Sequence, residues 1–232
     1  AETPRYGQGS VSVTTAGGTS AALPLNLMRP GTDSAAVGYL TDVAVDRTTG
    51  TTWVMNYGGP GQLLRVGPAT GSVLQTITMT TAMGPYDSAY GYGGLQVVPS
   101  AFSLGGTNVP QGSLLLLNGY GRNHVTALNP ANGAIVAQLD LAGGYMTSGV
   151  FDASTGLIFA TTNDDKLTSF NATTGAVVQS FDLPFGVTGH TGMAIDPATG
   201  NLWIGSSASG TNVVLVNRQG VEQRRVDLAG QG

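Results

Sequence analysis

Asp196-Pro-Ala-Thr-Gly200 is the stretch that decides the fold, because it recurs along the chain as Asp46-Arg-Thr-Thr-Gly50 and Asp152-Ala-Ser-Thr-Gly156. Each copy stands between an apolar stretch and a stretch that carries a tryptophan or a phenylalanine. Aspartate opens a turn with hydrogen bonds from its own side chain, and glycine supplies the positive φ with which the second strand turns back. The motif therefore predicts a β-hairpin, and its recurrence predicts a repeated architecture.

A second hairpin follows the first by roughly twenty residues in every repeat. Its copies are Gly67-Pro-Ala-Thr-Gly71, Asn129-Pro-Ala-Asn-Gly133, Asn171-Ala-Thr-Thr-Gly175 and Asn217-Arg-Gln-Gly220. Two hairpins per repeat give four antiparallel strands, and the stretches between them are short and β-branched, with no competing helical period. The spacing from position 152 to position 196 is 44 residues. A period of about 40–50 residues with four strands per unit is typical of propeller blades.

The sequence thus predicts an all-β protein, a β-propeller of four-stranded antiparallel blades. Residues 38–228 hold four complete blades, at about 38–80, 91–141, 145–183 and 190–228, and residues 229–232 form a tail. Residues 1–37 offer only two candidate strands, at 10–14 and 23–27, and are interpreted as a partial or degenerate blade. The number of blades stays open between a ring of four, a ring of five and a segment of a larger propeller.

The second blade departs from the pattern. A longer excursion rich in glycine and proline, at residues 99–112, replaces its first hairpin, and the loop before the blade, at residues 82–94, is also extended.

The composition excludes several classes of function. The 232 residues are 41% hydrophobic and 9% charged, as expected of a folded chain with a sizeable core. The net charge is −4 and Lys166 is the single lysine, so neither nucleic acid nor an anionic membrane is expected as a partner. No apolar run reaches the roughly 20 residues of a spanning helix, so no membrane insertion is expected. The absence of cysteine excludes disulfides and thiolate chemistry.

The chain begins Ala1-Glu2-Thr3-Pro4 rather than with methionine. A mature exported chain begins in this way once its signal peptide is removed, so an extracellular or periplasmic location is expected.

The succession of an apolar strand, Asp-Pro-x-Thr-Gly and a strand such as Asn201-Leu-Trp-Ile-Gly205 resembles bacterial propeller repeats of the NHL, YVTN and virginiamycin-lyase-like types. The resemblance covers roughly residues 38–228. It implies a propeller fold but no single function, because such repeats occur in enzymes, sensors and adhesins alike. The virginiamycin-lyase-like members use a histidine and acidic residues with a divalent metal, and of these only His190 matches in position.

One ring-bearing side chain per blade is expected on the rim of the central channel, where the innermost strands begin. Counting back six or seven residues from each first hairpin gives Tyr39, Tyr92, Tyr145 and His190. The sixth residue after each turn glycine is polar and is expected on the same face, at Asn56, Asn118, Thr162 and Ser206. Rings stack on apolar faces while amides and hydroxyls fix orientation, so this face predicts a site for a glycan or a protein segment. The same rings could instead plug the channel.

Two further sets of large side chains flank this predicted site. The third residue after each turn glycine is apolar and is expected to wedge between blades, at Trp53, Leu115, Phe159 and Trp203. The extended loop before the second blade carries Tyr86, Tyr90 and Tyr92 among small residues. Tyrosine in such company is typical of adaptable recognition loops, and a self-packed lid is the alternative.

Catalytic and metal-binding groups are few. His124 and His190 lie in different blades, so neither a histidine-ligated metal site nor a catalytic relay is predicted, and no cofactor is expected. Asp164 and Asp165 are weak candidates for holding a hard cation, because adjacent carboxylates lack the alternating spacing of calcium loops and are more typical of a solvated turn.

The leading hypothesis is therefore a non-catalytic binding module. The alternatives are a structural or assembly subunit that associates with other chains through its β edges, and a metal-assisted lyase or hydrolase that acts through His190.

Overall fold

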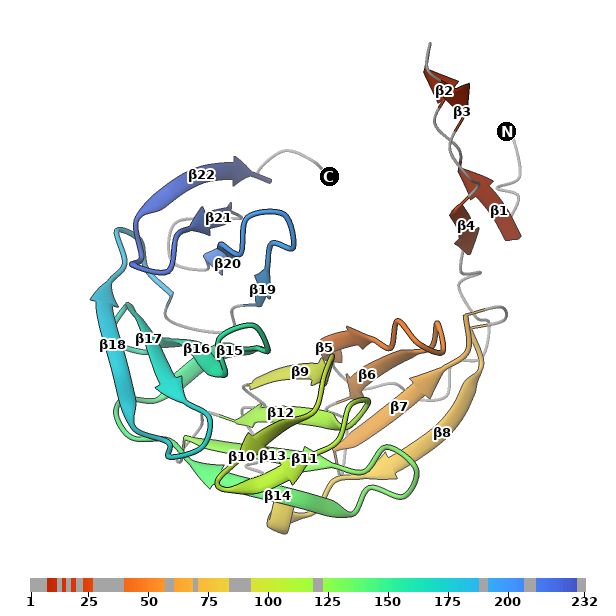
Figure 1. The fold of residues 1–232 in the computed structure, drawn as a ribbon, viewed down its shortest axis with the longest axis horizontal. Helices are drawn as coiled ribbons and strands as arrows, with labels where there is room; N and C mark the ends of the chain where they lie inside the picture. The colour runs from red at the N-terminus through yellow and green to blue at the C-terminus, as the bar shows by residue number, and fades with distance from the viewer. Residues whose placement is uncertain are drawn as a thin grey trace.

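The blade architecture is visible in the computed structural model, which describes residues 8–11, 14–15, 18–19, 23–26, 40–56, 61–68, 71–83, 93–118, 123–187, 192–206 and 212–228. Four antiparallel sheets of four strands are arranged as the blades of a β-propeller (Figure 1). In the described part of the chain, the one helical element is the 3-10 turn Thr81–Met83. The predicted fold class is confirmed.

The strands of each blade follow one another from the channel outward, and the blades are called A to D in chain order. Blade A consists of β5 (Leu40–Val45), β6 (Thr52–Asn56), β7 (Gln62–Val66) and β8 (Val73–Thr78). Blade B consists of β9 (Gly93–Val97), β12 (Leu114–Asn118), β13 (His124–Leu128) and β14 (Ile135–Asp140). Blade C consists of β15 (Met146–Asp152), β16 (Leu157–Thr162), β17 (Lys166–Asn171) and β18 (Val177–Asp182). Blade D consists of β19 (Met193–Ile195), β20 (Leu202–Ser206), β21 (Asn212–Val216) and β22 (Glu222–Asp227).

Two small ladders precede blade A. β1 (Gln8–Val11) pairs with β4 (Leu23–Asn26), and β2 (Thr14–Thr15) pairs with β3 (Gly18–Thr19). In Figure 1 these strands lie apart from the four sheets. They form two-stranded ladders, so a degenerate blade at residues 1–37 stays a prediction.

The recurring hairpins form as the sequence predicts. The turn glycines Gly50, Gly156 and Gly200 have φ angles of +69°, +68° and +71°, the left-handed region that favours glycine. In the first copy, Asp46 Oδ1 accepts a hydrogen bond of 2.9 Å from the amide of Thr48. The aspartate and the glycine therefore have the turn-forming roles that their spacing indicates.

Apolar clusters between neighbouring blades make up the core. Trp53 of blade A packs with Leu95 and Leu114 of blade B, and similar clusters join blade B to C and blade C to D. Leu115 and Phe159 lie in these two further clusters, so the predicted wedges are confirmed at three of the four positions. Full burial of a leucine or phenylalanine side chain stabilises a fold by about 1.5–3 kcal/mol, so the interfaces dominate stability.

The excursion at residues 99–112 adds a hairpin to the B–C interface. Its strands are β10 (Phe102–Leu104) and β11 (Thr107–Val109). Leu104 is fully buried in the cluster between blades B and C, and the ring of Phe102 stacks on that of Phe151 with 3.9 Å between centroids. The excursion in the second repeat is therefore an added hairpin that packs against the B–C interface.

Polar side chains also link the inner strands of neighbouring blades. Asp42 Oδ2 accepts a 2.5 Å hydrogen bond from the amide of Leu95, and burial raises the pKa of this carboxyl. Gln96 bonds both backbone groups of Phe151, accepting from the amide at 2.9 Å and donating to the carbonyl at 3.0 Å. These bonds satisfy inner-strand groups that face a neighbouring blade rather than a fifth strand.

We expect Gln96→Ala to lower the free energy of unfolding by roughly 1–3 kcal/mol, because it leaves a buried amide and a carbonyl of Phe151 without partners. Urea denaturation measures the loss. Gln179→Ala is the matched control, since Gln179 is exposed on β18. Equal effects of the two substitutions would contradict the linking role.

Candidate functional site

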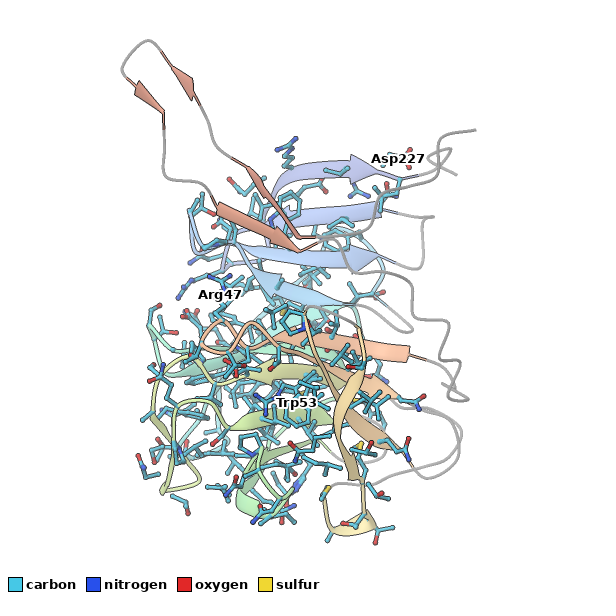
Figure 2. All side chains as sticks on the ribbon, turned by 90° about the vertical axis from the view of Figure 1, so that its right-hand side faces the viewer. Arg47, Trp53 and Asp227 are labelled. Carbon is cyan, nitrogen blue, oxygen red and sulfur yellow. The ribbon has the colours of Figure 1, made fainter. Side chains whose placement is uncertain are left out.

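The propeller has two ends, and each collects a different set of residues. In the side view of Figure 2, Arg47 lies at the left end, and Asp227 lies at the right end. We call the first the hairpin end, because it carries the first hairpins at residues 46–50, 152–156 and 196–200. The second is the rim end, where β15 begins after Tyr145 and where β6, β12, β16 and β20 stop.

Three of the residues predicted to form a ligand platform, Tyr145, Thr162 and Asn56, are described at the rim end. The side chain of Tyr145 is 53% exposed, and its carbonyl accepts a 2.9 Å bond from the amide of Asn163. Thr162 is buried, and its hydroxyl donates to Asp164 Oδ1 at 2.6 Å. Asn56 is also buried, and its Oδ1 has no hydrogen-bond partner among the described residues.

The four polar positions of the predicted platform are the last residues of β6, β12, β16 and β20, so their backbones end at the same level. The structure does not describe the side chains of Asn118 and Ser206. Tyr39, Tyr86, Tyr90, Tyr92 and His190 also lie outside the described residues. The ring of tyrosines and histidine therefore stays a prediction.

Asp164 and Asp165 form a tight turn between β16 and β17. Asp165 adopts a φ of +57°, and its Oδ1 accepts a 2.7 Å bond from the amide of Val187. The hydroxyl of Thr162 lowers the pKa of Asp164 by bonding its carboxylate. Across the residue ranges given above, no group of three or more potential metal-binding side chains comes together. These carboxylates thus shape a turn and hold the segment that follows blade C.

His124 is the first residue of β13 and is buried. Its Nδ1 lies 2.6 Å from Asp140 Oδ1 on the neighbouring strand. Asn123, just before it, accepts a 2.8 Å bond from the amide of Met146 in blade C. This polar stretch connects blades B and C at the rim end.

Two adjoining cavities open at the hairpin end. The channel cavity, of about 500 Å³, is lined by the inner strands of all four blades, including Val43, Val97, Val150 and Ile195. The A–B cavity, of about 450 Å³, lies between blades A and B. It is lined by Asp46, Thr48, Thr49, Trp53, Arg65, Gln111, Gly112, Pro130 and Ala131.

The two cavities share Asp46, Thr48, Gln111 and Gly112. The channel cavity reaches Gly149 and Val150, which are about 13 and 17 Å along the chain from Tyr145 at a strand rise of roughly 3.3 Å per residue. Both cavities therefore belong to the hairpin end, an end at which sequence reasoning placed no site. The irregular excursion, which supplies Gln111, is the sequence signal that could have pointed there.

The A–B cavity places an ionised carboxylate beside a buried indole. A hydrogen bond from the Thr49 hydroxyl, at 2.6 Å, does most to lower the pKa of Asp46, and the charge of Arg65 lowers it further. Arg65 Nε donates to Thr51 Oγ1 at 3.1 Å. The side chain of Trp53 is only 2% exposed. Carboxylate, guanidinium and indole together form a polar cavity with one aromatic wall.

The corresponding place between blades C and D is filled. Arg218 Nη2 lies 2.5 Å from Asp152 Oδ2, and the guanidinium carbon is 5.4 Å from the centroid of the Phe159 ring. Arg218 Nε also donates to the carbonyl of Gly200 at 3.2 Å. Burial raises the pKa of Asp152, but the bonds from Ser154 and Thr155 and the charge of Arg218 outweigh it, so the net pKa is lowered.

We expect Arg218→Gln to lower the free energy of unfolding at pH 7 by roughly 1.5–3 kcal/mol, the range for a charged hydrogen bond. The Asp152 pKa lies below its usual 3.8 in the folded chain, so stabilisation by this ion pair is complete well above pH 4 and is lost as the pH falls through the folded pKa. Urea denaturation of both proteins at pH 7 and near pH 2.5 should show the difference shrink. Arg224→Gln, at an exposed site on β22, is the control.

Comparisons with known proteins support the fold. Neither a known protein family nor a curated protein matches the sequence. A protein of unknown function from Bacteroides caccae is similar in structure, with a TM-score of 0.52, 12% identity, and coverage of 88% of this chain and 64% of that one. A second protein of unknown function, from Bacteroides thetaiotaomicron, has a TM-score of 0.55, 11% identity, and coverage of 81% and 43%.

BamB from Moraxella catarrhalis also matches, at a TM-score of 0.42 and 14% identity, with 82% of this chain and 62% of that one covered. Similarity at these identities concerns the fold alone. The chain spans less than two thirds of the length of each of the three structures. Among the described residues, no helix has the length and apolarity needed to cross a bilayer.

Proposed function

We propose that this chain is a non-catalytic propeller module that associates with further blades through the two flanks at which its row of blades stops. One observation carries the proposal. Apolar positions that are buried at the interfaces between blades are less buried on the two outer flanks: Trp203 on blade D is half-buried, and Val43 and Val45 on blade A are mostly exposed.

On the flank of blade D, the wedge residue is less buried than its three equivalents. Trp203 is half-buried, whereas its equivalents Trp53, Leu115 and Phe159 are 2%, 0% and 3% exposed. The difference arises because blades B, C and D cover the three buried wedges, and the structure places no described blade beyond Trp203.

The flank of blade A exposes the complementary surface. Val43 and Val45 on β5 are each 57% exposed. Their equivalents in strand register are less exposed: Leu95 corresponds to Val43 and is 6% exposed, and Phe151 corresponds to Val45 and is 1% exposed. The other apolar equivalents, Met193, Val97 and Ile195, are half-buried. No apolar cluster among the described residues joins blade D to blade A, and Figure 1 shows the blades as an arc that ends in blades A and D, with β5 and β19 on its inner side.

Uncovered β-branched side chains on a regular sheet favour association, because apolar surface leaves water when another blade packs against it. In this proposal the arc of blades continues into further blades. In a solution of the isolated chain, a second copy supplies those blades.

We expect the isolated chain to self-associate as its concentration rises, and we expect Val43→Asp combined with Val45→Asp to weaken this association at least tenfold. A carboxylate must lose its hydration to enter an apolar interface, whereas both positions tolerate charge in the separate chain because they are exposed. Light scattering over a concentration series measures the change. Val178→Asp, at an exposed site on β18, is the matched control. A wild-type chain that stays monomeric throughout would overturn the proposal.

The rim end supports a second candidate function, recognition of a glycan or a protein segment. The favouring observation is Tyr145, a large ring left 53% exposed where β15 begins. The proposed platform consists of Tyr39, Tyr92, Tyr145 and His190, backed by Asn56, Asn118, Thr162 and Ser206 and flanked by Tyr86 and Tyr90. The resemblance to NHL, YVTN and virginiamycin-lyase-like repeats and the exported location belong to this proposal as well.

We expect a polysaccharide or oligosaccharide ligand to raise the apparent melting temperature, since binding to the folded state stabilises it, and we expect Tyr145→Ala to remove the shift. A thermal-shift screen with sugars, calcium, manganese and a chelator makes the measurement. Val221→Ala, an exposed residue at the hairpin end, is the control. A shift that depends on metal and on His190, and not on sugar, would favour the lyase or hydrolase alternative instead.

A further inference from the structure

The interface between blades C and D contains a complete arginine-binding arrangement. Asp152 opens the first hairpin of blade C and receives Arg218 at 2.5 Å, while the ring of Phe159 lies beneath the guanidinium at 5.4 Å. A carboxylate gives a charge-assisted bond, and an aromatic face attracts the cation through its quadrupole. The arginine comes from the outer hairpin of the next blade, directly after Asn217.

The interface between blades A and B repeats the carboxylate and the aromatic ring without an arginine at the position of Arg218, and Arg65 of blade A lines the cavity instead. Asp46 corresponds to Asp152 as the residue that opens the first hairpin, and Trp53 corresponds to Phe159 as the third residue after the turn glycine. Pro130, directly after Asn129 in the outer hairpin of blade B, corresponds to Arg218. Proline carries no cation, and the A–B cavity, bounded by Asp46, Trp53 and Pro130, is open here.

The carboxylates of Asp46 and Asp152 each accept a hydrogen bond from the threonine three residues later. Asp46 Oδ2 accepts the hydroxyl of Thr49 at 2.6 Å, and Asp152 Oδ2 accepts the hydroxyl of Thr155 at 2.9 Å. Asp152 Oδ2 accepts Arg218 in addition, so a carboxylate oxygen in this turn can take both partners. Asp46 therefore retains the acceptor capacity that blade C uses for its ion pair.

We propose that the A–B cavity binds a guanidinium group, such as the side chain of an arginine presented by a partner protein, in the place that Arg218 takes between blades C and D. The cavity volume of about 450 Å³ falls within the roughly 300–1,000 Å³ of small-ligand pockets. Trp53, labelled within the body of the molecule in Figure 2, lines the cavity and is itself only 2% exposed. The proposal does not rest on the open flanks or on the rim.

Arg65 distinguishes the A–B cavity from the Arg218 site between blades C and D. At that site Ser169 has the strand position equivalent to Arg65. Arg65 Nε is bonded to Thr51 Oγ1, and no described ion pair joins Arg65 to Asp46. The cavity thus has a negative and a positive side. Free L-arginine carries a guanidinium and a carboxylate and suits both sides, so it is the probe of choice.

Tryptophan fluorescence reads the cavity directly. The chain has two tryptophans, so Trp203→Phe leaves Trp53 as the sole reporter. In this background we expect L-arginine to cause a saturable change in emission, and we expect L-citrulline, whose side chain is uncharged, to bind at least tenfold more weakly. Both titrations are run at one ionic strength and one pH. Absence of a saturable change with arginine, or equal binding of citrulline, would overturn the proposal.

Two substitutions locate the bound cation. Asp46→Asn removes the charge and should weaken arginine binding at least tenfold, whereas Asp196→Asn should leave it unchanged. Asp196 is the matched control because it opens the equivalent hairpin of blade D and its Oδ2 likewise accepts a threonine hydroxyl, that of Thr199, at 2.6 Å. If both variants lost L-arginine binding equally, the loss would come from a disturbed turn and not from the missing charge, and this would contradict the assignment.

Pro130→Arg supplies a second, independent test. It recreates the Arg218 arrangement between blades A and B, so we expect the tethered guanidinium to occupy the cavity and to abolish binding of free L-arginine. The variant should also melt at a higher temperature than the parent chain, and Asp46→Asn should remove that gain. Undiminished arginine binding by Pro130→Arg would place the ligand elsewhere and overturn the assignment.

Discussion

The structure depends on the requirement that each blade cover the apolar face of the next. A four-stranded sheet with two apolar faces cannot stay folded alone in water, because each face must leave water against another layer. Trp53, Leu115 and Phe159 meet this need at three successive interfaces. The inner-strand bonds of Asp42 and Gln96 then align neighbouring blades, since their backbone partners lie in the adjacent sheet. Because of the same requirement, the exposure of Val43 and Val45 indicates a blade face that no described blade covers.

Much of the fold could be predicted because the information is local. The aspartate, threonine and glycine of each first hairpin act within five residues of one another, and their roles at Asp46 and Gly50 follow from turn chemistry alone. The wedge positions follow from the turn glycine by strand alternation. Closure of the ring of blades is different, because it depends on whether a surface such as that around Trp203 finds a partner, and both Trp203 and Trp53 are tryptophan at the same position of their repeats.

The candidate site was harder to predict because it arises between repeats. Alignment of the repeats puts Asn56 and Thr162 in one set of corresponding positions and Tyr145 in another, and in the structure the strand ends next to all three lie at the rim end. The A–B cavity instead depends on a single difference, proline at position 130 where blade D has Arg218. Whether that difference leaves a space depends on where the outer hairpin of one blade meets the first hairpin of the preceding one, which only the packed structure shows.

The open flank and the A–B cavity are physically connected at Asp46. The channel cavity is lined by Val43 and Val45 of the flank, and its lining continues to Asp46, which also belongs to the A–B cavity. A blade packed on this flank would exclude water from the channel cavity. Lower local polarity strengthens an ion pair between Asp46 and a bound cation, and it raises the cost of an unpaired carboxylate. If both proposals hold, we therefore expect association through the flank and cation binding at Asp46 to favour each other, because a buried Asp46 needs a positively charged partner more than an exposed one does.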